Sequence, residues 1–287
     1  MSVFQHFLVT RFNLRVSEWK TTKSGLDVLS EAWLNDRFEK FESYCLPSVL
    51  NQKNKNFKWL IFFDKLTPSK YLSKIEKLQK THSGIYCYFI DGITELNDAF
   101  KEAINTLIDK NKDWIITTRL DNDDAIHENF VGEIQNNFIP QHETVIDARS
   151  GLQLNIQKEK AEVRKLHNEF NPFLSLVEKS DHFQTAISKP HREWKSSKNV
   201  VVLESEPLWI EVVHRNNKLN EADDKKFLVK KLKCKEFGLS PDIQFVSNGQ
   251  IFFNNTTRKI NLFLNHRKSV LKSITKRILI TRKKIDY

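Results

Sequence analysis

Glycine is scarce in this sequence, with seven residues among 287, and no two of them stand close together. Dinucleotide-binding and phosphate-cradling loops need closely spaced glycines, because their backbone must approach the phosphates. A Gly-x-Ser-x-Gly segment, which would place a nucleophilic serine on a tight turn, is also missing. These absences exclude the common Rossmann cofactor sites, the P-loop nucleotidases and the hydrolases that use that serine turn.

Cysteine and long apolar stretches are scarce as well. The three cysteines, Cys45, Cys87 and Cys234, lie far apart and match no metal-binding or redox spacing, so reduced thiols in a cytoplasmic protein are expected. No run approaches the roughly 18 apolar residues of a membrane-spanning helix. Residues 1–11 show no basic stretch followed by an apolar one, so no secretory signal is expected.

Acidic residues nearly vanish toward the end of the chain. Residues 256–287 contain ten basic residues and one acid, so they carry +9 of the formal net charge of +10. Leu264, Leu271, Ile274 and Ile278 would share one stripe if this segment is helical. A basic amphipathic helix is typical of binding to an anionic surface, here the inner face of the plasma membrane. The alternative is that the stripe packs on the body of the protein and the charges are only solvated.

A nucleic-acid-binding protein that uses this basic tail is the rival interpretation from another class. Such proteins usually carry positive charge along one face or groove of the folded domain. Here the charge is confined to one terminal segment, and the rest of the chain is nearly neutral. No nucleic-acid partner is therefore expected.

Strand-like and helix-like stretches alternate through the first half of the chain. The predicted strands cover residues 6–13, 57–63, 85–90 and 114–120, and the predicted helices cover residues 33–50, 68–80 and 96–110. This order predicts an α/β fold with an open, mainly parallel sheet flanked by helices. Further on, we expect a helix at residues 127–138, strands at 145–156 and 200–213, and a helical, charged region from residue 219.

Aspartates follow three of the predicted strands: Asp64, Asp91 and Asp121. Ligands of open α/β sheets bind beyond the carboxyl ends of the strands, so these acids are expected near a site. In extended backbone, Asp121 and Asp123 point to the same side of the chain. Two neighbouring carboxylates repel each other, and Mn²⁺ or Mg²⁺ relieves that repulsion while also binding substrate phosphates. The alternative is a solvated, aspartate-rich turn that caps the next helix.

With these segments in place, the chain resembles the glycosyltransferase A superfamily and, more narrowly, the bacterial "putative rhamnosyltransferase" family. The resemblance rests on residues 6–12, 45–52, 59–64, 118–125, 172–178 and 209–217. Its strongest parts are the Asp-x-Asp segment and the segment around His214. One departure is Arg215, which follows His214 where glycine is common in the family.

The resemblance implies a glycosyltransferase A fold and a metal-dependent transfer reaction. The donor would be a nucleoside diphosphate sugar, UDP- or dTDP-linked and by the family's label carrying rhamnose, and the acceptor a cell-surface glycan or a lipid-linked molecule. Residues 1–217 would form the nucleotide-sugar-binding catalytic domain, and residues 218–287 a helical extension with the basic amphipathic tail. An inactive scaffold of the same fold is the alternative. The oligomeric state is not predicted.

The resemblance also implies a metal site formed by Asp121, Asp123 and His214, with His191 as the weaker histidine candidate. Imidazole as a ligand favours Mn²⁺ over Mg²⁺. The competing interpretation of His214 is a half-buried histidine at a strand end with no ligand role.

Donor-binding and catalytic roles follow from position at strand ends. Thr10, Arg11 and Asp64 are expected at the nucleoside, and Arg119 at the donor diphosphate, because guanidinium groups suit phosphate oxygens. An ion pair of Arg119 with Asp64 or Asp91 is the alternative. If the reaction inverts the anomeric carbon, a carboxylate must take the proton of the acceptor. Glu178 is expected in that role, and Asp181 is the alternative.

Overall fold

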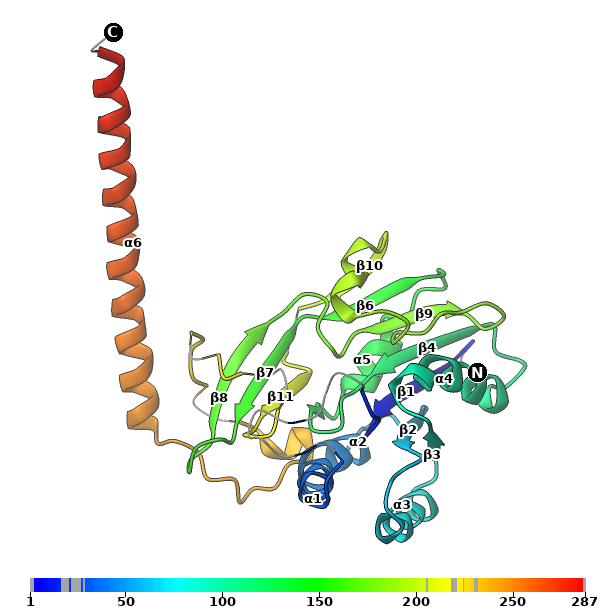
Figure 1. Cartoon of the computed structure of the whole chain (residues 1–287). Coiled ribbons are helices and arrows are strands. Elements are labelled where there is room, and N and C mark those ends of the chain that lie inside the picture. Colours follow the sequence, from blue (N-terminus) through cyan, green and yellow to red (C-terminus); the bar gives the residue numbers. More distant parts are fainter. Residues whose placement is uncertain are drawn as a thin grey trace.

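The computed structural model describes residues 3–16, 21, 27, 29–204, 206–217, 221–223, 225–229 and 232–285, with side chains placed as far as residue 268 except residue 266. Its first half alternates strand and helix, as the sequence predicts (Figure 1). In chain order the elements are β1 (Phe4–Arg11), α1 (Glu31–Lys40), the π-helical turn η1 (Phe41–Cys45), α2 (Leu46–Leu50), β2 (Lys58–Asp64), α3 (Ser69–Thr81), β3 (Ile85–Ile90), η2 (Ile93–Glu95), α4 (Leu96–Leu107) and β4 (Trp114–Arg119).

The second half is richer in strands than the sequence predicts. Its elements are β5 (Ala125–Ile126), α5 (Phe130–Asn136), β6 (Thr144–Ala148), β7 (Ser150–Asn155), β8 (Glu162–His167), β9 (Ser175–Lys179), η3 (His191–Ser196), β10 (Asn199–Leu203), β11 (Trp209–Val213), η4 (Cys234–Phe237) and α6 (Asn248–Ile285). Strands β8 and β9 lie in the stretch that showed no clear pattern. The prediction of a helical region from residue 219 is wrong for the described residues before Asn248. These residues form one short 3-10 helix, η4, and are otherwise not helical.

Two expected strands are each divided between two sheets. The segment 145–156 forms β6 in the large sheet and β7 in the small one, and 200–213 divides likewise into β10 and β11. Arg149 stands at the first break, where its side chain turns back to the carboxylate of Asp147. Pro207 stands in the second break, and proline cannot donate a ladder hydrogen bond. The second break falls in the polar stretch 204–207, a turn signal that the strand expected at 200–213 ran across.

The large sheet has seven strands in the order β10-β6-β9-β4-β1-β2-β3. All neighbouring pairs are parallel except those that involve β9, which runs antiparallel to β4 and β6. Helices α1, α2, α3 and α5 cover one face of the sheet, and α4 covers the other. Because both faces are covered, β2 is an almost unbroken apolar run, with Trp59 to Phe63 fully buried. The predicted α/β class and the mainly parallel sheet are confirmed.

The small sheet, in the order β5-β11-β7-β8, lies beside the large one (Figure 1). Trp209 joins the two sheets, because its ring stacks on Phe173 at a centroid distance of 4.8 Å and its Nε1–H donates to the carbonyl of Ala148 at 2.6 Å. Gly151 on β7 makes room for that ring, since a Cβ atom there would stand 2.2 Å from it. Residues after 217 also contribute to the hydrophobic core of the small sheet. Leu232, Phe237 and Leu239 lie in the same cluster as the buried side chains of β7 and β11.

The helix expected at residues 33–50 is one continuous helical segment with a π turn inside it. Ser30 caps its start by accepting from the backbone N–H of Trp33. At η1, the N–H of Leu46 donates to the carbonyl of Phe41, five residues back. Pro47 follows directly, and its missing N–H accounts for a widened turn at this point. Helix α1, the first part of this segment, reaches the carboxyl edge of the sheet, where its Arg37 bonds Asn122 after the end of β4.

Helix α6 projects from the body of the molecule, as Figure 1 shows in orange and red. Its first turns are anchored, because Ile251 is buried and the Asn255 side chain bonds both the N–H and the carbonyl of Leu228. Within the described part of the chain, no helix is long and apolar enough to cross a membrane.

Candidate functional site

The acidic segment predicted from the sequence lies at the carboxyl ends of the parallel strands. Strand β4 ends at Arg119, and residues 121–124 form a turn, in which the N–H of Asp124 donates to the carbonyl of Asp121 at 3.3 Å. The extended geometry expected for Asp121 and Asp123 is therefore wrong. Because the chain turns here, the two carboxylates have different partners.

Two arginines hold Asp121. Arg119 Nη2 donates to its carboxylate at 2.8 Å, and Arg11 Nε, from the end of β1, lies 3.4 Å away. Burial alone would raise the pKa of Asp121, but Arg119 and Arg11 outweigh it and hold the pKa well below its usual range. Asp121 is thus ionised, and the three side chains form one charged cluster. The alternative partners considered for Arg119, Asp64 and Asp91, instead bind Arg15.

Asp123 is buried and its Oδ2 atom has three donors. Arg37 Nη1 lies 3.2 Å away, His214 Nε2 3.1 Å and Asn217 Nδ2 3.2 Å. Burial alone would raise the pKa of Asp123. The guanidinium of Arg37 and the hydrogen bond from His214 have the larger, opposite effect, so the net shift of the pKa is downward. The carboxylate is therefore the acceptor at the centre of a group of positive and polar side chains.

Strand pairing brings His214 to this place. Strand β5 follows the acidic turn directly and pairs antiparallel with β11, whose last residue precedes His214. Asp124 strengthens the connection, because its carboxyl accepts from the N–H of Val212 at 2.9 Å. Burial, together with Asp123 and Asp121, raises the pKa of Asp124 well above its usual value. Asp124 therefore ties the turn to β11.

Asp123 and His214 have the spacing of two ligands of one cation. Ligands that stand about 2.1 Å from Mg²⁺ at right angles lie about 3.0 Å from each other, and Oδ2 and Nε2 are 3.1 Å apart. On the other side of the imidazole, Nδ1 lies 4.0 Å from Oδ2 of Asp36, and both atoms are buried without a hydrogen-bond partner. If Nε2 binds a cation, the proton moves to Nδ1, where Asp36 faces it. The donor set therefore fits a divalent cation.

Asp121 does not join that pair, since its carboxylate is bound to Arg119 and Arg11. Within the described ranges, no three His, Cys, Asp or Glu side chains gather to hold a metal ion. A site with two protein ligands is normal for Mg²⁺, which keeps several waters and binds substrate phosphates.

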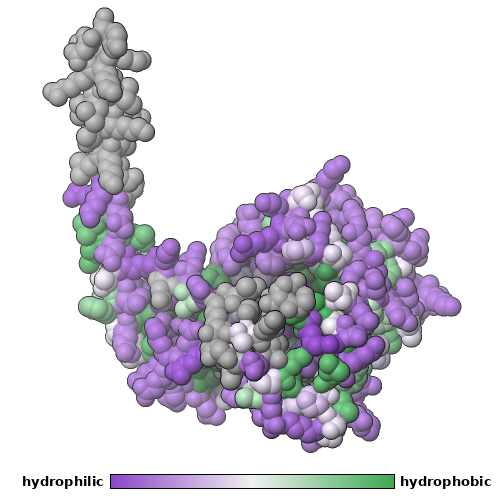
Figure 2. Space-filling view, in the orientation of Figure 1, coloured by the Kyte–Doolittle hydropathy of each residue, from purple (hydrophilic) through white to green (hydrophobic). Residues whose placement is uncertain are grey.

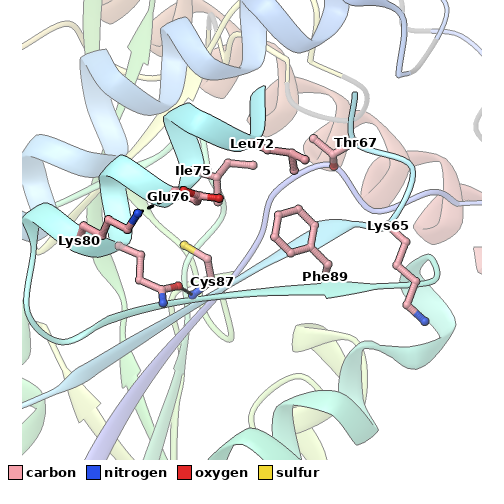
Figure 3. Close-up of a pocket in the computed structure, with 9 residues that line it drawn as sticks. Lys65, Thr67, Leu72, Ile75, Glu76, Lys80, Cys87 and Phe89 are labelled. Atoms are coloured by element: carbon pink, nitrogen blue, oxygen red, sulfur yellow. Dashed lines mark hydrogen bonds and ion pairs between the residues drawn. The ribbon is translucent and has the colours of Figure 1, made fainter. Parts of the chain in front are cut away.

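A cavity of about 320 Å³ opens beside His214, and Asp36 also lines it. Lys40, Lys158 and Arg215 stand around the same cavity. Glu159 lines it as well, so the cavity wall carries charges of both signs. A larger cavity of about 430 Å³ lies between α3 and β3, and Figure 3 shows Phe89, Leu72 and Ile75 in its wall. The residues of the acidic turn do not line that second cavity, so it is separate from the candidate site.

Thr10 and Asp64, expected at the nucleoside, are fully buried. The hydroxyl of Thr10 accepts from Nε1 of Trp59 at 2.9 Å. The carboxylate of Asp64 accepts from the backbone N–H of Arg15 and from its Nε, each at 3.0 Å. The structure therefore gives both residues partners inside the protein, and Arg15, which the sequence analysis missed, presents the charge at this strand end.

Glu178 and Asp181 lie far from the acidic turn along the strands. Glu178 pairs with Ile115 near the beginning of β4, whereas the turn follows the end of that strand. Its buried carboxylate accepts from the N–H of Gln184 at 2.7 Å and of Thr185 at 3.0 Å. Burial raises the pKa of Glu178, although these two N–H groups favour the ionised form. The structure does not bring Glu178 or Asp181 together with the other site residues, and Asp181 is exposed.

His191 lies closer to the charged cluster than the sequence indicated. It begins η3, and its ring contacts the carbonyl of Phe170, in the loop that follows β8 and precedes β9. Burial lowers the pKa of His191, and Arg119, Arg192 and Asp121 also act on it. His191 therefore stands within electrostatic reach of the Arg119–Asp121 pair.

Arg37, Asn217 and Asp36 are the other site residues that the sequence analysis missed. Arg37 lies on α1, and its Nη1 also donates to Asn122 at 2.9 Å. Asn217 stands three residues after His214 and accepts from the His214 backbone N–H at 2.5 Å. The spacing of Asn217 after the histidine could have suggested a turn, but nothing in the helix pattern distinguishes Asp36 or Arg37 from surface charges.

The sequence profile of one protein family, described as "Putative rhamnosyl transferase", matches residues 5–226. The comparison with curated proteins finds no match. Among solved structures, S. aureus TarS residues 1–349 with UDP-GlcNAc shares 11% identity and a TM-score of 0.44, over 77% of this chain and 62% of that one. Rv0371c from Mycobacterium tuberculosis shares 10% identity and a TM-score of 0.33, over 75% of this chain and 90% of that one.

The chain thus spans less than two thirds of the TarS fragment. The family match covers most of the chain, from β1 past β11, and includes the acidic turn and His214. It confirms the resemblance found in the sequence, and the chain belongs to the "Putative rhamnosyl transferase" family of glycosyltransferases.

Proposed function

We propose that this protein transfers a sugar, rhamnose by the family's name, from a nucleoside diphosphate donor to a glycan or lipid-linked acceptor of the cell surface. The observation that carries the proposal is the pair of Asp123 and His214, 3.1 Å apart at the carboxyl edge of the sheet. Arg37 contacts Asp123, and Arg11 and Arg119 bind Asp121 in the same turn, which suits a ligand that carries a diphosphate.

In this proposal, Asp123 and His214 hold Mn²⁺ or Mg²⁺. The cation supplies charge neutralisation to the departing diphosphate. Asn217 and Asp36 keep the two side chains in place, because Asn217 contacts Asp123 and Asp36 faces the ring of His214. Asp121 has a different task, since it orients Arg11 and Arg119 at the donor phosphates.

The nucleoside, uridine or thymidine, lies in the proposal beyond the ends of β1 and β2. Asp64 acts there through Arg15, which it fixes. Thr10 and its partner Trp59 are both fully buried, so Thr10 supports the end of β1 from inside the protein. The Arg15 side chain is 38% exposed and can reach a ligand. Ion pairs with aspartates hold Arg11 and Arg15 at this edge before any ligand arrives.

We further propose that α6 binds the anionic inner face of the plasma membrane, where a lipid-linked acceptor is found. Beyond the buried Ile251, its described apolar side chains are exposed, among them Phe252, Phe253, Ile260, Phe263 and Leu264. Figure 2 shows apolar surface on the described part of this helix. Leu271, Ile274 and Ile278 of the predicted stripe have side chains outside the described residues. Helix α6 contains no acid, so a second copy of it would be repelled, whereas anionic lipid attracts it.

A panel of nucleotide sugars in a thermal-shift assay, each with and without Mn²⁺, tests the donor proposal. At 100 times its dissociation constant, a ligand stabilises the folded state by about 2.7 kcal/mol. We expect a clear rise in Tm with UDP- or dTDP-linked sugars and a larger one when Mn²⁺ is present. If no nucleotide sugar shifts Tm under either condition, the chain is a scaffold without donor binding and the proposal fails.

A further inference from the structure

The imidazole of His191 has one nitrogen bound to the protein and the other without a partner among the described residues. The ring of His191 contacts the carbonyl of Phe170 through Nδ1. A carbonyl oxygen can only accept, so Nδ1 must carry the proton. In the neutral ring, Nε2 then holds a lone pair. Among the described residues Nε2 has no hydrogen-bond partner, and it is not one of the buried atoms left without one.

The carbonyl that orients this ring is itself held in place. Phe170 has a left-handed backbone, with φ at 47°. Its N–H donates to both carboxylate oxygens of Asp147 at 3.1 Å. Asp147 is fully buried near the end of β6 and is paired with Arg149 at 3.0 Å. A non-glycine residue keeps such a conformation only where its surroundings enforce it. The orientation of His191 therefore rests on the large sheet itself.

The free nitrogen belongs to the same edge as the donor site. The first residue of β9, Ser175, pairs with Thr118 near the carboxyl end of β4. The N–H of Arg119 donates to the carbonyl of Leu174, in the loop that carries Phe170. The charged groups that act on His191 are Arg119 and Asp121 from the end of β4 and Arg192 from its own turn. The Arg119–Asp121 pair is the proposed contact with the donor diphosphate, so an acceptor that approaches the sugar comes near His191.

We propose that His191 is the general base of the transfer and that Nε2 takes the proton of the acceptor hydroxyl. This inference rests on the proposed function. As the acceptor oxygen forms its bond with the anomeric carbon, its O–H proton passes to Nε2. The bond between the anomeric carbon and the diphosphate breaks, and its electron pair leaves with the diphosphate. A direct displacement of this kind inverts the anomeric carbon.

The protonation state of the ring suits this role. Burial, with Arg119 and Arg192, lowers the pKa of His191 below its usual value, against the opposing effects of the Phe170 carbonyl and Asp121. The imidazole is therefore neutral at pH 7 and ready to accept a proton. Since the neutral form is the active one, the transfer rate should be constant near pH 7 and fall as the pH drops through the lowered pKa.

His191→Asn separates the two functions of the ring. The asparagine amide occupies the position of Nδ1 and can still donate to Phe170, but it has no group in the position of Nε2. We expect kcat to fall by about 100- to 10,000-fold, while Tm and the Kd for UDP or dTDP change less than threefold. Lys195→Ala, an exposed residue of the same turn that does not act on the ring, is the matched control and should keep kcat.

Two results would overturn this inference. One is a His191→Asn protein that transfers within threefold of the wild-type rate. The other, which does not depend on the variant folding, is a wild-type kcat that stays constant down to the lowest pH at which the protein remains folded. Donor binding distinguishes the two proposals, because a wild-type protein that binds no nucleotide sugar contradicts the proposed function, whereas either result above leaves that function intact.

Discussion

At the scale of single residues, the arrangement around Asp123 shows what burial demands of a carboxylate. One oxygen has Arg37, His214 and Asn217 as donors. A buried charge without such partners would cost several kcal/mol. The arginine and histidine stabilise the ionised form before a cation arrives, so cation binding must displace one of these contacts. The contact replaced is the hydrogen bond between His214 Nε2 and Asp123, because both atoms then face the cation.

Glu178→Gln tests whether the buried acid of β9 is structural, as its contacts indicate. Glutamine has one acceptor oxygen, so one of the N–H groups of Gln184 and Thr185 loses its partner. An unsatisfied buried donor costs about 1–3 kcal/mol. Denaturant unfolding should show that loss, and the transfer rate should stay within a few-fold of wild type. A rate at least 100-fold lower with unchanged unfolding free energy would instead restore Glu178 as a catalytic residue.

At the scale of elements, helix α6 is attached to the body by its first turns and exposes apolar side chains in the turns that follow. Ile251 and Asn255 attach its first turns, and the apolar side chains beyond them are exposed. Truncation before Thr256 therefore leaves the attachment intact. We expect the full chain to sediment with phosphatidylglycerol vesicles at low salt, to release them at high salt, and to ignore phosphatidylcholine. The truncated chain should stay in solution.

Phe263→Ser with Leu264→Ser removes apolar area from α6 and keeps every charge, so it is the matched control for the electrostatic part of this binding. Each Lys or Arg near an anionic surface contributes about 1 kcal/mol at low salt. The double variant should bind more weakly than wild type and more strongly than the truncated chain. Equal sedimentation of the truncated and full chains, or no sedimentation of the full chain at low salt, would contradict the membrane proposal.

The same scale shows why sequence patterns located some elements and missed others. Strands β1 to β4 could be predicted, because each is a short apolar run between turn signals, and their order fixes the parallel sheet. Strand β8 could not, because Glu162, Arg164 and Lys165 hide its period. The division of 145–156 into β6 and β7 depends on the packing of Trp209 against Gly151, which lies far away in sequence.

At the scale of the whole molecule, two sheets and one helical segment converge on the acidic turn. The Asp-x-Asp turn and His214 could be predicted, since both stand at strand ends in recognisable segments. Arg37 and Asp36 could not, because helix α1 brings them to the turn only through tertiary packing. The boundary at residues 217 and 218 stays a prediction, although Leu232 and Phe237 share a core with the small sheet.

Calorimetric titration of UDP and dTDP with and without Mn²⁺ tests the central claim, a cation held by Asp123 and His214, most directly. We predict that Mn²⁺ tightens nucleotide binding at least tenfold in the wild type, which corresponds to about 1.4 kcal/mol. His214→Ala should lose most of that enhancement, and His167→Ala, an exposed histidine on β8, should keep it. Equal enhancement by Mn²⁺ in the wild type and in His214→Ala would contradict the account.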